Sequence, residues 1–127
     1  MKTKFLFIIL STLIIMLTGC KSEKEEKKEK YDSSINQVVT LENKRLQKEK
    51  ILTDTDILKR EDIGIAVYQN GDFIELIYEL KPNKQTESLY KKDKSKSYKL
   101  FPNQKIKRGD VNKELEKIDY VENTALK

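Results

Sequence analysis

A single cysteine, Cys20, carries the most distinctive chemistry in this chain of 127 residues. It directly follows Leu17, Thr18 and Gly19. The small residues at 18 and 19 let the backbone lie extended in a peptidase groove, and the thiol can take a diacylglycerol through a thioether bond. Cleavage before Cys20 would then make it the first residue of the mature chain. With no second cysteine, the chain has no intramolecular disulfide to form.

The residues before Cys20 have the layout of a signal peptide. Lys2 and Lys4 give a basic start with no acid, and residues 5–17 are apolar except for Ser11 and Thr12. At ~1.5 Å per helical residue the apolar stretch covers about 20 Å, which is short of the ~30 Å hydrocarbon core of a bilayer. Residues 1–19 are therefore predicted to be a cleaved signal peptide. The alternative is an ordinary thiol at the end of a membrane anchor.

The sequence LTGC at residues 17–20 resembles the lipobox of bacterial lipoproteins. The resemblance implies that the signal peptidase recognises Leu17, Thr18 and Gly19, and that Cys20 is lipidated. Two acyl chains anchor a protein stably where one is marginal, because each buried methylene contributes about 0.8 kcal/mol. We therefore expect the protein at the cell membrane, on its extracytoplasmic face, with the membrane as partner through diacylglyceryl-Cys20.

Residues 21–30 follow the cysteine with five Lys, four Glu and no apolar side chain. Such a stretch cannot bury enough surface to offset its ordering entropy, so residues 20–30 are predicted to be a lipidated cysteine and a disordered tether. A transient helix with i,i+4 Glu–Lys pairs is the alternative. Removal of two lysines with the signal peptide leaves 24 − 21 = +3. This net positive charge mildly favours binding to anionic lipid or wall polymers. The chain has only three Arg residues, and they are scattered, which argues against nucleic-acid binding.

The rest of the chain lacks the side chains of most catalytic and metal sites. There is no histidine, which excludes Ser-His-Asp and Cys-His systems and imidazole metal ligands. Asp54 and Asp56 are not followed by the ligands of a calcium loop, so we interpret them as capping and solvated charges. No cofactor, metal site or catalytic residue is therefore expected. Glu75 and Glu79 leave a carboxylate hydrolase as a minor alternative, and residues 108–110 spell Arg-Gly-Asp, a short match that arises easily by chance.

Residues 31–109 are predicted to form one small domain that begins with a helix over residues 31–52. Asp32 or Ser33 can cap its start. One side of this helix is apolar, although Glu42 interrupts it; the apolar residues are Ile35, Val38, Val39 and Leu46. A polar connector is expected over residues 53–62.

Asn70-Gly71 predicts a type I′ hairpin between two β-rich runs, because both residues tolerate positive φ. A two-residue turn pairs Tyr68 with Phe73 and so sets the register of the residues further from the turn. This register divides the side chains between the two faces of the hairpin. The apolar face should receive the helix and consists of Ile63, Ile65, Val67, Ile74, Leu76 and Tyr78. The other, mixed face offers Tyr68, Phe73 and Ile77 as a candidate partner surface, with cover by the C-terminal segment as the equal alternative.

Two further strands are expected at residues 86–91 and 96–101, with Leu89, Tyr98 and Leu100 as core candidates. Residues 110–127 are predicted to be a short helix capped by Asp110, or a tail. Its apolar side would consist of Val111, Leu115 and Ile118. The predicted fold class is α+β, with the N-terminal helix packed on a four-stranded antiparallel meander.

Beyond the lipobox, the chain resembles the small cystatin-like fold lipoproteins of staphylococci. The likeness rests on YDSSINQVVTLEN at residues 31–43, VYQNGDFIELIYEL at 67–80 and YKKDKSKSYKLF at 90–101. This family implies the fold and the membrane address but no established activity. The cystatin inhibitor loop, Gln-x-Val-x-Gly, is absent. We expect a lipid-anchored, non-enzymatic surface binding module with a protein or wall-polymer partner; an accessory lipoprotein of a mobile element, for conjugation or exclusion, is the alternative.

Overall fold

The computed structural model describes residues 22–102 and 113–123, and the chain divides into two units, Met1–Lys30 and Tyr31–Lys127. Helix α2 runs over Glu23–Lys48. The Ser22 Oγ accepts a hydrogen bond from the Glu25 N–H at 3.3 Å, and Lys27 lies 3.5 Å from Glu23 one turn away. Residues 23–30 are therefore helical, and the predicted disorder is wrong there. The predicted start at Asp32 or Ser33 is also wrong, because the helix begins at Glu23.

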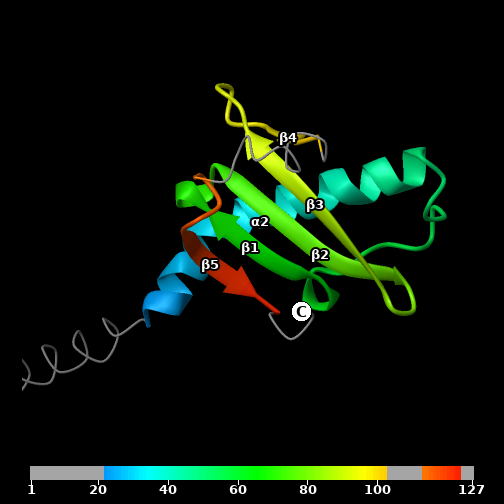
Figure 1. The fold of residues 1–127 in the computed structure, drawn as a ribbon, viewed down its shortest axis with the longest axis horizontal. Helices are drawn as coiled ribbons and strands as arrows, with labels where there is room; N and C mark the ends of the chain where they lie inside the picture. The colour runs from blue at the N-terminus through cyan, green and yellow to red at the C-terminus, as the bar shows by residue number, and fades with distance from the viewer. Residues whose placement is uncertain (1–21, 103–112, 124–127) are drawn as a thin grey trace, which may run out of the picture. The chain divides into compact units, whose positions relative to one another are not determined.

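The second unit contains a five-stranded antiparallel sheet in the order β4-β3-β2-β1-β5 (Figure 1). The elements that follow α2 are η1 Arg60–Asp62, β1 Gly64–Tyr68, η2 Gln69–Gly71, β2 Phe73–Lys81, β3 Lys84–Lys92, β4 Tyr98–Leu100 and β5 Ile118–Glu122. The predicted α+β class is confirmed. The predicted meander corresponds to β1 to β4, and β5 adds a fifth strand at the free edge of β1.

The hairpin between β1 and β2 has the predicted register. Tyr68 pairs with Phe73 and Val67 with Ile74, and the pairing continues to Gly64 and Ile77. At the turn, Asn70 has φ 54 and ψ 32, and Gly71 has φ 94. The Asp72 N–H donates to the Gln69 carbonyl at 3.1 Å and closes the turn. The positive φ angles explain why Asn-Gly occupies this position.

The apolar sheet face packs against α2, as predicted, and forms the larger core. Figure 1 shows the helix behind the sheet. The six predicted residues of this face are all buried, together with five residues of the helix: Tyr31, Ile35, Val38, Val39 and Leu46. Leu89 and Tyr98 are also buried, but the third core candidate, Leu100, is 42% exposed on the edge strand β4.

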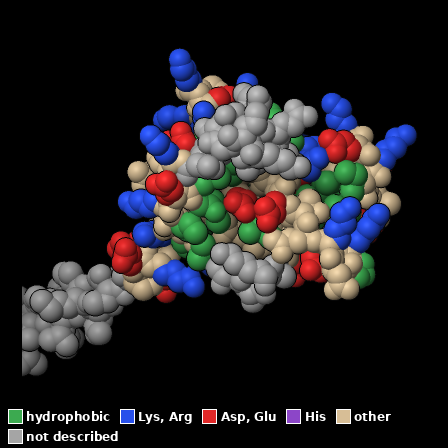
Figure 2. Space-filling view, in the orientation of Figure 1, with side chains coloured by type: hydrophobic (Ala, Val, Ile, Leu, Met, Phe, Trp, Pro, Cys, Tyr) green, Lys and Arg blue, Asp and Glu red, His purple; other side chains and the backbone are tan. Residues whose placement is uncertain are grey.

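The opposite sheet face is a second, smaller core, so the candidate partner surface is not exposed. Phe73 is 3% exposed, and Tyr68 and Ile77 are also buried. Leu115 and Val121 pack against this cluster, which is the alternative that the sequence left open. Figure 2 looks onto this face and shows acidic side chains among apolar ones near its middle. The Tyr68 hydroxyl donates to Glu75 at 3.2 Å, and burial, with the charge of Glu75 second, raises the pKa of Tyr68 to about 12.

The C-terminal segment forms a strand where a helix was predicted. Asp110 and Val111 lie outside the described residues, Leu115 lies in a turn, and Ile118 begins β5. The strand pairs with β1: Ile65 lies opposite Glu122 at one end, and Tyr68 lies opposite Ile118 at the other. The register shifts between Val67 and Tyr68. Over the part that the structure describes, the predicted short helix is therefore wrong. The alternative of a tail is wrong for residues 118–122 too, because they belong to the sheet and extend the domain past its predicted end at residue 109.

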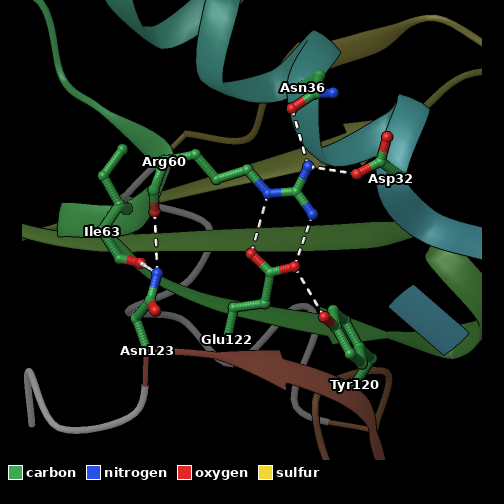
Figure 3. Close-up of polar contacts among 7 residues, drawn as sticks. All are labelled: Asp32, Asn36, Arg60, Ile63, Tyr120, Glu122 and Asn123. Atoms are coloured by element: carbon green, nitrogen blue, oxygen red, sulfur yellow. Dashed lines mark hydrogen bonds and ion pairs between the residues drawn. The ribbon is translucent and has the colours of Figure 1, made fainter. Parts of the chain in front are cut away.

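Arg60 ties β5 to the helix across the end of the sheet (Figure 3). Its guanidinium donates to both carboxylate oxygens of Glu122, at 2.9 and 2.6 Å, and to Asp32 and Asn36 of α2, at 2.7 and 2.9 Å. The Tyr120 hydroxyl donates to the same Glu122 carboxylate at 2.7 Å. This bidentate arrangement fixes the geometry of the strand. Asp32 therefore bonds Arg60 instead of capping the helix.

Candidate binding cleft

Glu42 is a fully buried carboxylate inside the larger core, at 0% exposure. Its Oε1 accepts hydrogen bonds from the Arg45 Nε at 2.8 Å, from the Arg45 Nη2, and from the Tyr78 hydroxyl at 3.2 Å. Its Oε2 is buried and has no hydrogen-bond partner among the described residues. A buried charge of this kind depends on its counter-ion, because it has lost its water shell.

Arg45 connects this buried carboxylate to the surface at the end of α2. Its Nη1 donates to Glu49 at 2.8 Å, directly after the last residue of α2, while its side chain is 25% exposed. Burial is the largest single effect and lowers the pKa of Arg45, but the charges and hydrogen bonds of Glu42 and Glu49 together outweigh it and raise the pKa above its ordinary value. The guanidinium is therefore held in one orientation between Glu42 and Glu49.

Two tyrosines of the sheet face the same carboxylate. Burial raises the pKa of Tyr78 and of Tyr90, and in both the negative charge of Glu42 is the second cause. Both phenols therefore stay protonated and neutral at physiological pH. Ser88, which is also buried, hydrogen-bonds with Tyr78, and this bond partly offsets the rise in the pKa of Tyr78.

The end of α2 has the hydrogen bonds of a Schellman motif. The Ile51 N–H donates to the Leu46 carbonyl at 2.8 Å, and the Lys50 N–H to the Gln47 carbonyl at 3.0 Å. Lys50 takes the left-handed conformation that this motif requires, at φ 59. The Leu52 N–H also reaches the Leu46 carbonyl, at 3.2 Å. This turn folds Ile51 and Leu52 back toward the last turn of the helix.

The β2–β3 turn approaches the same region from the sheet. Pro82-Asn83 closes the turn, with Asn83 at φ 64, and Lys81 pairs directly with Lys84 across it. Two like charges at directly opposite positions of a hairpin repel each other. Neither lysine forms an ion pair with another described residue. An anion between them would therefore be stabilising.

These elements enclose a half-open cleft of about 440 Å³. The volume lies within the range of small-molecule sites, about 300–1,000 Å³. Its lining combines apolar, cationic and hydroxyl groups, with one carboxylate: Arg45, Leu46, Ile51, Leu52, Leu80, Lys81, Lys84, Thr86, Glu87 and Ser88. Such a lining can hold a small ligand that has an apolar part and an anionic group. Within the described residues, no group of three or more potential metal ligands occurs.

The residues singled out in the sequence do not form this cleft. Leu17, Thr18, Gly19 and Cys20 lie outside the described residues, as do residues 108–110. Of the helices that the structure describes, none is long and apolar enough to cross a membrane. Glu79 is exposed on β2, whereas Glu75 accepts the bond from Tyr68.

The sequence contains one signal that points to the cleft. Glu42 interrupts the apolar side of the predicted helix, at four residues from both Val38 and Leu46. A carboxylate at a core position must be paired, and Arg45, three residues later, lies within reach on the same side of a helix. The contributions of Tyr78 and Ser88 depend on sheet packing and carry no such local signal.

Comparison with known proteins gives a likeness of fold and no family. No protein-family model matches it, and no curated protein matches it. Among solved structures it is similar to a DUF4467 family protein from Staphylococcus aureus, with a TM-score of 0.54 and 22% sequence identity, over 73% of this chain and 96% of that chain. At this identity the likeness shows the fold alone. The described domain therefore shares the fold of this staphylococcal DUF4467 family protein.

Proposed function

We propose that this protein is a lipid-anchored, non-enzymatic binding module on the outer face of the cytoplasmic membrane. The anchor is diacylglyceryl-Cys20, supported by the lipobox-like residues 17–20 and the signal-peptide layout before them. The domain is assigned to the cystatin-like lipoproteins of staphylococci, supported by the helix laid on an antiparallel sheet and by the fold shared with a staphylococcal protein.

The cleft at the end of α2 is the observation that carries the binding part of this proposal. Its apolar side is built by Leu46, Ile51, Leu52 and Leu80, and its cationic side by Arg45, Lys81 and Lys84. Arg45 is already neutralised by Glu42 and Glu49, so the two lysines are the groups that attract an anion. The ligand class is therefore a small amphipathic anion, with its apolar part against the leucines and Ile51.

Replacing Cys20 with alanine is expected to abolish lipid attachment and to block processing of the precursor. The thiol is the only group in the chain that can form the thioether, because there is no second cysteine. Membrane fractionation and the size of the precursor on gels measure this. A matched Ser22→Ala variant, which keeps the thiol, should be processed and retained normally. Unchanged membrane retention of the Cys20→Ala protein would show that the anchor is not Cys20.

The cleft is tested with 8-anilinonaphthalene-1-sulfonate, a probe that carries fused aromatic rings and one sulfonate. We expect a single saturable site, measured by fluorescence titration. Ile51 is 50% exposed in the lining, and Ile51→Gln should weaken binding about tenfold through lost apolar contact. Lys84→Glu should weaken binding by a similar factor, because it places a negative charge at the anion position.

Ile57 supplies the matched control for the cleft. It is a comparably exposed isoleucine, at 58%, in the same segment between α2 and η1, but it does not line the cleft. Ile57→Gln should therefore leave the probe affinity unchanged. If the two isoleucine variants bind the probe equally, the probe is reporting general surface hydrophobicity and the cleft is not the site.

A further inference from the structure

The β3–β4 hairpin carries a run of closely spaced positive charges. Residues 91–99, here called the lysine hairpin, read KKDKSKSYK, with five lysines and one aspartate, or 5 − 1 = +4. The Asp93 carboxylate is ionised, because the hydrogen bond from the Ser95 hydroxyl, foremost among several, lowers its pKa. The positive charge of the hairpin is therefore only partly neutralised.

The turn that presents these lysines is held in one conformation. The Asp93 Oδ1 accepts hydrogen bonds from the Ser95 N–H at 2.9 Å and from the Ser97 N–H at 3.1 Å. Lys99 lies 3.5 Å from the Asp93 carboxylate, and Lys92 lies over the Tyr98 ring at 5.7 Å. The remaining lysines of the turn, Lys94 and Lys96, are exposed and form no ion pair with another described residue. These two ammonium groups are available to a partner.

The base of the lysine hairpin lies close to the start of the second unit. The Tyr98 hydroxyl donates to the Gly71 carbonyl at 2.5 Å, and the Lys92 N–H donates to the Asp72 carbonyl at 2.8 Å. Tyr31 also lies against Gly71, with its ring 3.3 Å from the position that a Cβ would occupy there. Tyr31 is the first residue of this unit. The lysine hairpin and the entry of the chain are thus joined through the β1–β2 turn.

We propose that the lysine hairpin docks onto the anionic headgroups of the membrane to which the protein is anchored. An anionic membrane surface attracts lysines within about one Debye length, roughly 8–10 Å. An acyl chain at Cys20 holds the entry end of the domain, and therefore the lysine hairpin, near that surface at high effective concentration. This proposal extends the lipid anchoring proposed above, and its test does not use the acyl chain.

The test uses the mature chain from Cys20 onward with Cys20→Ser, which carries no lipid. Co-sedimentation with phosphatidylglycerol-containing vesicles is compared with co-sedimentation with phosphatidylcholine vesicles. We expect binding to the anionic vesicles only, weakening as NaCl is raised. Each lysine near such a surface contributes about fivefold in affinity, so Lys94→Gln together with Lys96→Gln should lower it about 25-fold.

Lys44→Gln together with Lys48→Gln is the matched control. It removes the same charge from exposed positions of α2 beside the cleft, at the other end of the domain. Its vesicle binding should stay within about twofold of the parent. Equal losses in the two double variants, or no preference for anionic vesicles, overturn the proposal. Binding of soluble polyglycerol phosphate without binding of vesicles overturns it as well, and would assign the hairpin to a wall polymer. None of these outcomes bears on lipidation, which the Cys20→Ala variant tests separately.

Discussion

Replacing Arg45 with alanine should lower the free energy of unfolding of the domain by about 3 kcal/mol. The substitution leaves the Glu42 carboxylate buried, facing the hydroxyls of Tyr78 and Tyr90. Removing one partner of a buried ion pair typically destabilises a protein by about 3–5 kcal/mol. We expect the lower end of that range, because the Arg45 side chain is 25% exposed and water can reach the vacated position. Denaturant unfolding monitored by circular dichroism measures the change.

Two further variants separate the buried pair from the surface pair. Glu49→Ala removes the exposed partner of Arg45 and should change stability by less than about 1 kcal/mol. Glu42→Leu combined with Arg45→Met replaces the pair by apolar side chains and should recover most of the loss of Arg45→Ala. If Arg45→Ala is no more destabilising than Glu49→Ala, Glu42 does not depend on Arg45.

The central hairpin could be predicted from the sequence because its information is local. Asn70-Gly71 selects the turn, and the turn sets the register of every pair back to Gly64 and Ile77. The apolar face then follows from side-chain alternation, and its burial against α2 follows from the need to cover it. These steps require no knowledge of distant residues.

The fifth strand could not be predicted in the same way, because its partner is distant in the sequence. Residues 118–122 contain both a helical spacing with Leu115 and a strand-like alternation of Ile118, Tyr120 and Glu122. The free edge of β1 and the bidentate bond from Arg60 favour the strand. All five residues of β1 are buried, which is typical of a strand that is flanked on both edges and covered on both faces.

The start of α2 does not follow from residues 21–30 taken as an independent segment. An isolated short charged segment must overcome the entropic cost of helix nucleation. Here the helix is continuous through Lys48, so each further residue adds only a propagation step. Glu and Lys have good helix propensity, and the acidic first turn interacts favourably with the helix dipole.

Replacing Phe73 with serine should lower the free energy of unfolding by about 4 kcal/mol. Phe73 is 3% exposed in the second core, and its ring meets Phe101 edge to face at 6.1 Å and lies under Lys91 at 5.6 Å. Truncation of a buried phenylalanine leaves a cavity and typically destabilises a protein by about 3–5 kcal/mol. Thermal unfolding measures the effect as a large fall in melting temperature.

Leu100→Ser is the matched control for Phe73→Ser, because Leu100 is 42% exposed on the edge strand β4. It should change stability by less than about 1 kcal/mol. The opposite outcome is a Phe73→Ser protein that keeps its melting temperature and fails to capture a partner from cells. That result would show that Tyr68, Phe73 and Ile77 form a contact surface. A large fall in melting temperature instead shows that this sheet face is core, and leaves the cleft at the end of α2 and the lysine hairpin as the two proposed binding surfaces of the domain.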